Sequence, residues 1–339
     1  MIAHCVEVAA WEADHLRAAF EREPAVEAQL VDGRIDAHLD ELAEARVLST
    51  FINSSVTEAV LDRMPALELI ATRSTGHDHI DLAACARRRI AVANVPTYGE
   101  NTVAEHAFAM ILALSRRLLP AERRGRRGEF DLEGLQGFDL KGRTLGVVGA
   151  GRIGLHVIRI GRAFDMEVLA HDPEPQPIIA DVLDFAYVGF DELLERSHVI
   201  SLHAPAVAAT HHMIDAGALA RMRPGAILVN TARGDLIDTA ALVEALASGR
   251  LGGAGLDVFE GEREIGEEQV LLTEGRDPGL RAALGRRLLA DRDDVILTPH
   301  NAFDSVEAVQ RIAATTVANI AAWARGEPIN LVSPGEAAR

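Results

Sequence analysis

The chain alternates between short apolar runs and longer segments in which apolar residues recur every three or four positions. A short run rich in Val, Ile and Leu predicts a buried strand, whereas the spacing of three to four predicts an amphipathic helix. Strands that alternate with helices predict a parallel sheet covered by helices on both faces. The strands expected on this basis are residues 2–8, 47–52, 67–73, 90–94, 144–148, 166–170, 199–203, 226–230, 253–258 and 295–297.

The intervals between these strands carry the helical pattern. Residues 102–119 are apolar around most of the helix circumference, which predicts burial on more than one side, and Pro120 should end this helix. Residues 305–325 form an amphipathic pattern that is long enough to return towards the first strands. The other helices expected are residues 11–20, 56–64, 81–88 and 240–248. The first hundred residues therefore make one α/β unit, and a second begins after them.

The strand at 144–148 runs into a turn that contains Gly149, Gly151 and Gly154, and a helical pattern follows. This is the spacing of a dinucleotide-binding turn: the first glycine allows the sharp turn, the second lets the backbone approach a pyrophosphate, and the third lets helix and strand pack closely. The helix N-terminus then offers N–H groups and a positive dipole end to the phosphates.

The next strand ends at Asp172, about 20 residues beyond the glycines, where a carboxylate is expected to accept hydrogen bonds from the adenosine ribose. The same carboxylate would repel a 2′-phosphate, so the cofactor expected is NAD rather than NADP. Three glycines alone are compatible with an ordinary tight turn. The strand, the helix and the acid around them favour dinucleotide binding.

Length and composition restrict the number of domains, the cellular location and the metal content that are expected. A chain of 339 residues predicts two domains, with hinge points near Asn101 and Asn301 and the second domain inserted into the first. No apolar run has the roughly 20 residues of a membrane span and no signal peptide is evident, so a cytoplasmic protein is expected. Cys5 and Cys85 predict neither a disulfide framework nor a zinc site, and no metal is expected.

The formal charge of -17 disfavours nucleic-acid binding, which needs a basic surface to displace counterions. One short segment departs from this acidic balance because arginines crowd it. A solvated or subunit-facing surface is favoured over an anion site for these residues. They are Arg116, Arg117, Arg123, Arg124, Arg126 and Arg127.

Candidate chemistry lies where three of the expected strands end, in VNTARG, GLDVFEGE and TPHNAF. Taken singly, Arg233, Glu262 and His300 could be a surface charge, a loop acid and an ordinary histidine. Beside a nicotinamide they suit hydride transfer to a 2-keto acid. A guanidinium holds a carboxylate through two parallel bonds, imidazole exchanges a proton near neutral pH, and an adjacent carboxylate stabilises the imidazolium.

The chain resembles the D-isomer-specific 2-hydroxyacid dehydrogenases over nearly its whole length. The resemblance rests on STGHDHIDL, NVPTYGENTVAEH, VVGAGRIG with HD, LHAP, VNTARGDLIDTAAL, GLDVFEGE and TPHNAF, in the family's order. It implies two Rossmann-like doubly wound parallel-sheet α/β domains. The substrate domain would comprise residues 1–100 and 301–339, and the NAD-binding domain residues 101–300. It also implies a homodimer joined largely through the helix after Asn101, with Arg233, Glu262 and His300 as the catalytic residues.

The same resemblance implies the roles of further residues. For the cofactor, Asp257 would bind the nicotinamide carboxamide, and for the substrate the backbone around Gly76 would meet the carboxylate. His203 is expected to be structural. The cofactor set is Gly149, Gly151, Arg152, Ile153, Gly154, Asp172, Ala204, Pro205, Thr210, Thr231, Ala232 and Asp257, and the substrate set is Thr75, Gly76, His77, Tyr98 and Phe303.

Within the family the D-lactate branch is the nearest match, on Tyr98, on Phe303 three residues past His300, and on the long excursion between Glu262 and His300. Pyruvate and D-lactate are therefore the expected substrate pair. Asn53 stands where related sequences often carry tyrosine in the substrate pocket, so the side chain of the preferred 2-keto acid stays open. The alternatives are glyoxylate or hydroxypyruvate reduction on the same scaffold, and a non-catalytic NAD(H)-sensing protein similar to corepressors.

Overall fold

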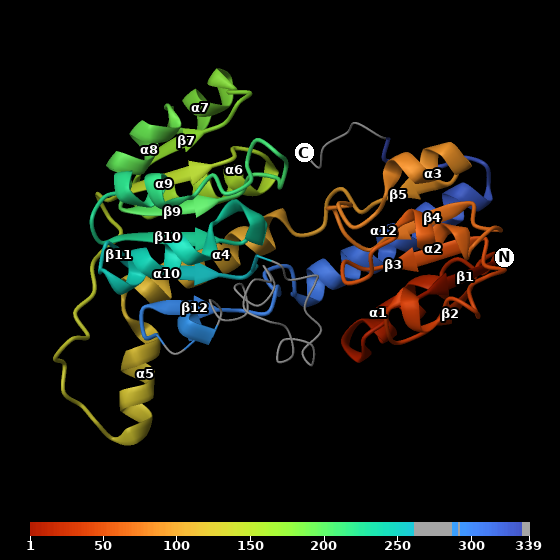
Figure 1. Cartoon of the computed structure of the whole chain (residues 1–339), viewed down its shortest axis with the longest axis horizontal. Helices are drawn as coiled ribbons and strands as arrows, with labels where there is room; N and C mark the ends of the chain where they lie inside the picture. The colour runs from red at the N-terminus through yellow and green to blue at the C-terminus, as the bar shows by residue number, and fades with distance from the viewer. Residues whose placement is uncertain (261–286, 291, 334–339) are drawn as a thin grey trace. The chain divides into compact units, whose positions relative to one another are not determined.

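The computed structural model describes residues 1–260, 287–290 and 292–333. The chain divides into two units, Met1–Gly99 with Asp304–Arg339, and Glu100–Phe303 (Figure 1). Each unit has its own sheet, in which all the pairs of neighbouring strands are parallel. The expected fold class, two doubly wound α/β domains, is confirmed.

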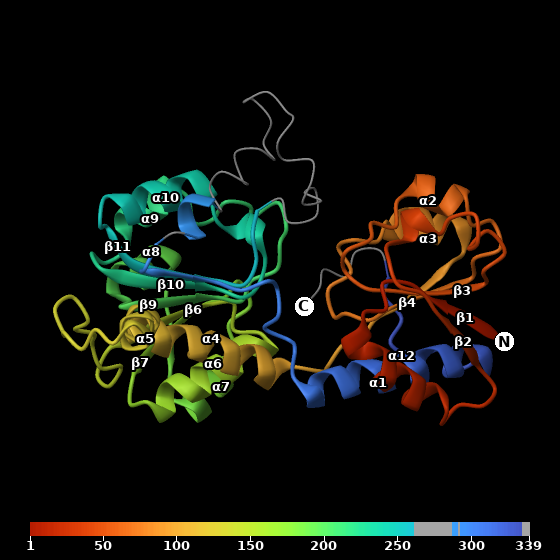
Figure 2. The ribbon, with the colours of Figure 1, turned by 90° about the horizontal axis from the view of Figure 1, so that it is seen from below.

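The first unit is built on a five-stranded sheet in the order β2-β1-β3-β4-β5. Helices α1 and α12 pack together on one face of the sheet, and α2 and α3 cover the other (Figure 2). The strands are β1 (Ile2–Cys5), β2 (Glu27–Leu30), β3 (Val47–Thr50), β4 (Leu69–Thr72) and β5 (Ala91–Ala93). The helices are α1 (Ala10–Phe20), α2 (Glu58–Asp62), α3 (Leu82–Arg88) and α12 (Val306–Ala324).

The second unit has a seven-stranded sheet in the order β12-β11-β10-β9-β6-β7-β8. The order reverses between β6 and β9, which is where open α/β sheets bind their ligands. The strands are β6 (Thr144–Val148), β7 (Glu167–His171), β8 (Ala186–Tyr187), β9 (Val199–Leu202), β10 (Ala226–Asn230), β11 (Leu251–Leu256) and β12 (Val295–Leu297).

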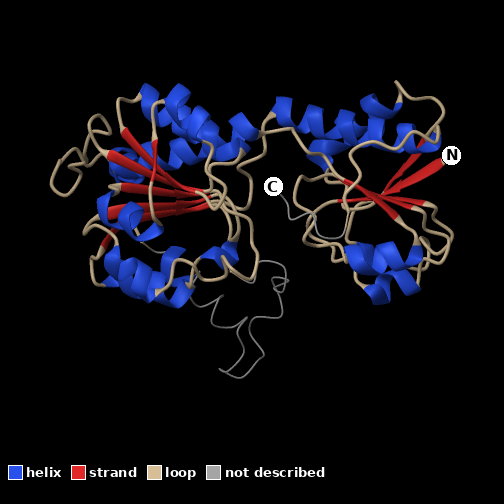
Figure 3. Ribbon diagram, turned by 90° about the horizontal axis from the view of Figure 1, so that it is seen from above, coloured by secondary structure: helices blue, strands red, loops and turns tan. Residues whose placement is uncertain are grey.

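Helices cover both faces of this second sheet, as Figure 3 shows. One apolar cluster lies under α4 and α6, and another lies under α8, α9 and α10. The helices are α4 (Glu100–Ser115), α5 (Leu118–Arg127), α6 (Arg152–Ala163), α7 (Pro177–Leu183), α8 (Phe190–Arg196), α9 (Ala216–Arg221) and α10 (Thr239–Ala247). Several begin at a side-chain cap, such as Asp215 before α9 and Asp238 before α10.

The long helix expected at 102–119 is two helices, because the chain breaks at Arg117. That residue adopts a left-handed conformation with φ of 48°, after which α5 begins at Leu118. Pro120 does not end a helix; it is the third residue of α5. The first-turn N–H groups of a helix have no intrahelical partner, so proline is tolerated there.

The expectation from apolar runs also missed β2 and β8. Residues Glu27–Leu30 read EAQL, and none of the four is fully buried. Both strands lie at the edge of a sheet, with β2 flanking β1 and β8 flanking β7. An edge strand has only one hydrogen-bonded neighbour and often an exposed face, so its sequence carries a weaker apolar signal.

A buried ion pair anchors the carboxyl end of the first sheet. The Arg73 guanidinium is fully buried and donates to both oxygens of the Glu12 carboxylate, at 3.2 and 3.0 Å. It also donates to the backbone carbonyls of Val6 and Glu7, at 2.8 and 3.0 Å, and to the Ser49 hydroxyl at 3.2 Å. Arg73 therefore ties the ends of β1, β3 and β4 to helix α1.

The two cysteines are buried free thiols in the first unit. Burial raises the pKa of both Cys5 and Cys85 to about 11, which keeps the thiols protonated and unreactive. Among the described helices, none combines the length and the apolar character that crossing a membrane requires.

Candidate active site

The glycine turn after β6 shows three distinct environments. Gly149 has a left-handed φ of 92°, and a side chain there would lie 2.7 Å from the His203 backbone. A side chain at Gly154 would collide with the Gly149 carbonyl, so helix α6 packs close to the turn. At Gly151, by contrast, a Cβ would meet nothing within 4 Å. The open space therefore lies at the middle glycine, where a pyrophosphate was expected.

Asp172, at the end of β7, accepts two backbone hydrogen bonds. Its Oδ2 accepts from Ala150 N and its Oδ1 from Glu174 N, both at 2.8 Å. The first of these bonds ties the carboxylate to the glycine turn, so Asp172 shapes the turn. The half-buried side chain keeps part of its surface in solvent, where ribose hydroxyls could approach. Arg152, the first residue of α6, lies 3.8 Å from the Glu100 carboxylate.

The segment after β9 closes on itself at Thr210. The Thr210 hydroxyl donates to the Pro205 carbonyl at 2.6 Å and accepts from Val207 N at 3.0 Å. Ala204 is buried and Pro205 is exposed. His203 lies 2.8 Å from the Ser201 hydroxyl, and burial lowers the pKa of its ring to about 3. Such a ring is neutral near pH 7, which supports a structural role over a proton donor.

Asn230, which sequence reasoning did not single out, folds the turn after β10. It is fully buried; its Nδ2 donates to the Arg233 carbonyl at 2.8 Å and its Oδ1 accepts from Ala232 N at 3.0 Å. Half-buried Arg233 donates from Nη1 to the Ala232 carbonyl at 2.7 Å. The Thr231 hydroxyl is buried and has no hydrogen-bond partner among the described residues. An amide at the end of an apolar strand was the available signal for Asn230.

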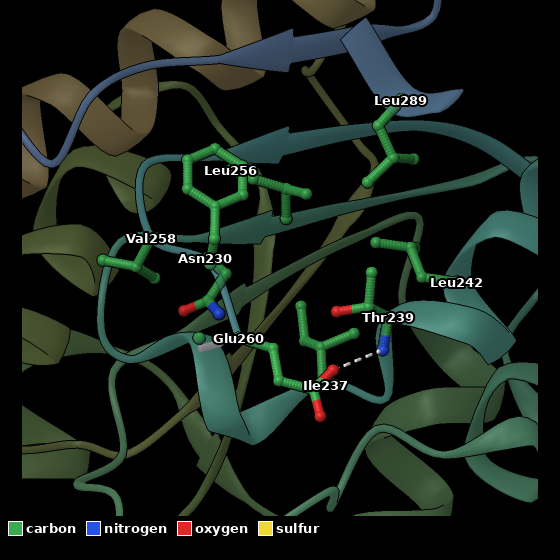
Figure 4. A pocket seen from close by; sticks show the side chains of 10 residues that line it. Asn230, Ile237, Thr239, Leu242, Leu256, Val258, Glu260 and Leu289 are labelled. Carbon is green, nitrogen blue, oxygen red and sulfur yellow. Dashed lines mark hydrogen bonds between the residues drawn. The ribbon is translucent and has the colours of Figure 1, made fainter. Parts of the chain in front are cut away.

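Behind this turn the chain is tightly packed. A side chain at Gly234 would collide with the backbone of Phe259 and Glu260, so only glycine fits beside Arg233. Figure 4 shows the small pocket behind the turn, lined mainly by apolar side chains such as Ile237. There the Glu260 carboxylate accepts from Thr239 N at 3.2 Å and lies 2.9 Å from His212 Nε2.

Asp257, at the end of β11, organises the turn that carries His300. Its carboxylate is fully buried and accepts from the Thr298 hydroxyl at 2.5 Å, and from the backbone N–H groups of Asn301 and Ala302 at 2.9 Å. Its own carbonyl accepts from His300 N at 2.8 Å. These bonds hold half-buried His300 in a left-handed conformation with φ of 53°.

This geometry changes the interpretation of Asp257. The side chain was expected to bind the nicotinamide carboxamide, but in the structure both of its oxygens are buried and engaged by the turn. The structure gives it a positioning role, and contact with the carboxamide stays a prediction. His106 of α4 completes the cluster: its Nε2 lies 3.2 Å from the Thr298 hydroxyl and 3.7 Å from Asp257 Oδ1. Nothing in the spacing of the sequence linked His106 to this turn.

Arg233, Asp257 and His300 thus follow β10, β11 and β12, three neighbouring parallel strands. Their carboxyl ends share one edge of the sheet, as the sequence predicted. Glu262, the expected partner of His300, lies outside the described residues. Phe303, at the end of the His300 turn, is buried.

In the first unit, the expected substrate loop follows β4. Four consecutive carbonyls of this loop, at residues 74–77, accept hydrogen bonds from the protein: Ser74 O from Val95 N, Thr75 O from the Asn94 amide, Gly76 O from the Ser74 hydroxyl, and His77 O from Ile80 N. Gly76 and His77 are buried, and Thr75 and Tyr98 are half-buried. With its carbonyls turned towards the protein, the loop suits an anion, which is attracted by N–H groups and repelled by carbonyl oxygens.

The second unit fits a bound dinucleotide at several points. The space at Gly151 is open, the buried Thr231 hydroxyl has a hydrogen-bonding capacity that the described residues do not use, and Asp172 lies beside the turn. The metal-ligating residue types form no cluster of three or more in the part of the chain that the structure describes.

Comparisons with known proteins agree with this geometry. Residues 108–302 match the family model described as D-isomer specific 2-hydroxyacid dehydrogenase, NAD binding domain. A 2-hydroxyacid dehydrogenase homolog of Haemophilus influenzae is 39% identical over 282 residues, 82% of this chain and 83% of that protein. A glyoxylate reductase of Thermococcus litoralis is 35% identical over 303 residues, 87% of this chain and 86% of that protein.

The crystal structure of a D-lactate dehydrogenase from Aquifex aeolicus, complexed with NAD and lactic acid, superposes with a TM-score of 0.88. It is 35% identical in sequence, and the match covers 99% of this chain and all of that one. Together with the family match, this likeness supports NAD as the cofactor.

The contrast between two glycines predicts two separable defects. Gly151→Ala should leave the thermal unfolding midpoint nearly unchanged but weaken NADH binding, because the added methyl group enters open space that the cofactor would occupy. Gly154→Ala should lower the midpoint by several degrees, because overpacking costs about 1–3 kcal/mol. Calorimetry and NADH fluorescence titration measure both effects. Equal NADH affinity in wild type and Gly151→Ala would contradict the placement of the pyrophosphate.

Proposed function

Because the chain belongs to the family of D-isomer-specific 2-hydroxyacid dehydrogenases, and is an NAD-dependent oxidoreductase, we propose that it interconverts pyruvate and D-lactate. The observation that carries the proposal is the set of side chains at one edge of the second sheet. Arg233 and His300 follow β10 and β12, on either side of β11, the strand that Asp257 follows. A cation and a proton carrier held at the same edge of one sheet are what reduction of a 2-keto acid requires.

When bound, NADH supplies the hydride that reduces the carbonyl carbon. We assign to Arg233 the task of holding the substrate carboxylate and polarising the carbonyl, since a guanidinium offers parallel donors in a fixed plane. Protonated His300 would give its proton to the developing alkoxide, and would take it back when D-lactate is oxidised. Glu262 is proposed to keep His300 protonated through its negative charge.

The left-handed backbone of His300 is relevant to this assignment. A histidine with positive φ is uncommon, and such strained positions gather at functional sites when the surroundings hold them in place. Here the fully buried Asp257 supplies the restraint, through the N–H groups of His300, Asn301 and Ala302. The restraint would limit the directions in which the imidazole can point and so favour one geometry for proton transfer.

For the substrate side we propose Thr75, Gly76 and His77, with Tyr98 and Phe303. The inward-facing carbonyls of the loop after β4 support the first three as the carboxylate-binding segment. Pyruvate is favoured by the likeness to the Aquifex D-lactate dehydrogenase over nearly the whole chain. Glyoxylate or hydroxypyruvate reduction is the second candidate, favoured by the likeness to the Thermococcus glyoxylate reductase. Asp172, which accepts from Ala150 N beside the turn, supports NADH over NADPH.

We also propose a homodimer. The second unit exposes large apolar side chains just beyond α4, with Leu118 of α5 56% exposed, Phe130 83% and Leu132 78%. The last turn of α5, which precedes Phe130 and Leu132 in the sequence, carries Arg124 and Arg126 on a chain that is acidic overall. Exposed apolar residues of this size favour a protein interface, and a second copy supplies both the apolar patch and the acidic surface.

Loss of the imidazole at residue 300 should abolish most of the turnover. His300→Ala is expected to lower kcat with pyruvate and NADH by a factor of about 10²–10⁴, the usual contribution of a general acid or base. His15→Ala, on helix α1 and outside every proposed site, serves as the control and should match the wild type. Steady-state NADH oxidation checks both variants. Near-normal turnover of His300→Ala would exclude His300 as the general acid or base. If the wild-type protein bound NADH tightly but showed no turnover, the alternative of a non-catalytic NAD(H)-sensing protein would be favoured.

The proposed interface predicts a change in mass. Replacing both Phe130 and Leu132 by Asp should convert a dimer into a monomer, because the interface would then have to desolvate carboxylates. Analytical ultracentrifugation measures the mass, and Ile178→Asp, a similarly exposed position at 79% on helix α7, is the control. A double variant with the sedimentation of the wild-type dimer, or a wild-type monomer, would overturn the interface.

A further inference from the structure

The first unit contains a chain of three asparagines that ends at the expected substrate loop. Asn330, after helix α12, donates from Nδ2 to Asn319 Oδ1 at 2.7 Å. Asn319, on α12 and 1% exposed, donates in turn to the Asn94 carbonyl at 2.8 Å. Asn94, directly after β5, donates from its side chain to the Thr75 carbonyl at 2.8 Å. Each amide thus donates towards the loop.

The segment that carries Asn330 is fixed to the same sheet by its backbone. Asn330 O accepts from Asn94 N at 3.1 Å, and Val332 N donates to the Val92 carbonyl at 2.8 Å. Leu331 pairs antiparallel with Ala93. Asn330 itself has a left-handed backbone with φ of 53°, a conformation that asparagine tolerates better than most residues. The segment after α12 is therefore held against β5, with the Asn330 amide directed to α12.

Helix α12 braces the same stretch at a second point. Arg311, two turns before Asn319, donates from Nε to the Tyr98 carbonyl. The residues between these two points, from Asn94 to Tyr98, connect β5 to the end of the first unit. Within the stretch, Val95 N donates to Ser74 O at 3.0 Å, and the Thr75 hydroxyl donates to Val95 O at 2.7 Å. Residues 94–95 and the loop after β4 are thus linked by hydrogen bonds that each segment donates to the other.

The orientation of the Thr75 peptide depends on this series of hydrogen bonds between asparagines. Its carbonyl accepts from Asn94, and Ser74 O and Gly76 O on either side of it also accept bonds from the protein. A peptide group is planar, so fixing the Thr75 carbonyl fixes the direction of the following N–H, which belongs to Gly76. Removing the Asn94 donor would let this peptide rotate and bring a carbonyl dipole towards a bound anion.

We propose that Asn94, Asn319 and Asn330 are positioning residues, which orient the backbone of the loop at Thr75 and Gly76 towards the carboxylate of a 2-keto acid. The inference rests on the proposed function, since it takes that loop as the site of the substrate carboxylate. It assigns a role in substrate recognition to the last part of the chain, which follows every residue of the proposed catalytic set. These asparagines touch neither substrate nor cofactor, and they act through the loop.

The test uses the full-length protein and the variant Asn319→Leu, which has a similar volume but removes both hydrogen bonds of the central amide. The KM for pyruvate should rise about tenfold, the factor that corresponds to about 1.4 kcal/mol of lost binding. The value of kcat and the NADH affinity should stay close to those of the wild type, because Arg233, His300 and the glycine turn are untouched. Gln310→Leu, at an exposed amide of the same helix, is the matched control and should leave KM unchanged.

A role confined to stability would give a different result. Asn319→Leu would then unfold at a lower temperature but keep the wild-type KM in its folded fraction, and that outcome would overturn the proposal. Asn94→Ala removes only the bond to Thr75 O, at a half-buried position, and provides the same test if Asn319→Leu does not fold.

Hydrogen exchange separates this inference from the proposed function, since it needs no turnover. Faster exchange of the amides at 74–77 in both asparagine variants, together with the raised KM, supports the proposal. Unchanged exchange would refute the positioning role itself. Faster exchange with an unchanged KM would also overturn the proposal, and would place the error in the assignment of the loop to the substrate.

Discussion

The geometry of the candidate site depends on the hydrogen bonds that the fully buried carboxylate of Asp257 accepts. A carboxylate without water needs several donors, and this one has the Thr298 hydroxyl and the N–H groups of Asn301 and Ala302. These donors all come from one turn, so satisfying the charge also fixes the turn. His300 lies in its centre, and a left-handed backbone is the conformation that the surrounding bonds impose. The hydrogen bonds that stabilise the buried Asp257 carboxylate thus also position His300, the proposed proton carrier.

The same principle recurs at the other strand ends. Asn230 has a buried amide whose donor and acceptor are both satisfied by the turn that carries Arg233. In the first unit, buried Arg73 ties three strand ends to α1, and the carbonyls at residues 74–77 of the loop after β4 accept hydrogen bonds from the protein. Parallel strands end at one edge of a sheet, and buried polar groups there give the following loops their shape. The other side chains and N–H groups at that edge are the ones proposed to bind the substrate and the cofactor.

Much of this arrangement could be predicted from the sequence because parallel strands are continuous apolar runs. The bounds of β6, β10 and β12 agree with the expected 144–148, 226–230 and 295–297. Arg233 and His300 follow two of these strands, so their common edge was predictable. Hydrogen bonds between residues far apart in the sequence were not predictable. The link from His106 to Thr298 spans 192 residues and that from Asn319 to Asn94 spans 225, and neither leaves a periodic signal. The break at Arg117 was missed because it rests on one backbone angle within an apolar segment.

Product analysis is the sharpest test of whether the chain reduces a small 2-keto acid with NADH. Purified protein would be incubated separately with pyruvate, glyoxylate and hydroxypyruvate, using NADH or NADPH carrying deuterium at the transferable position, and the products would be separated on a chiral column. The proposed roles of Arg233 and His300 predict the highest kcat/KM for pyruvate with NADH, and D-lactate with deuterium at C2. No deuterium transfer to any of the three acids, or formation of L-lactate, would contradict these roles.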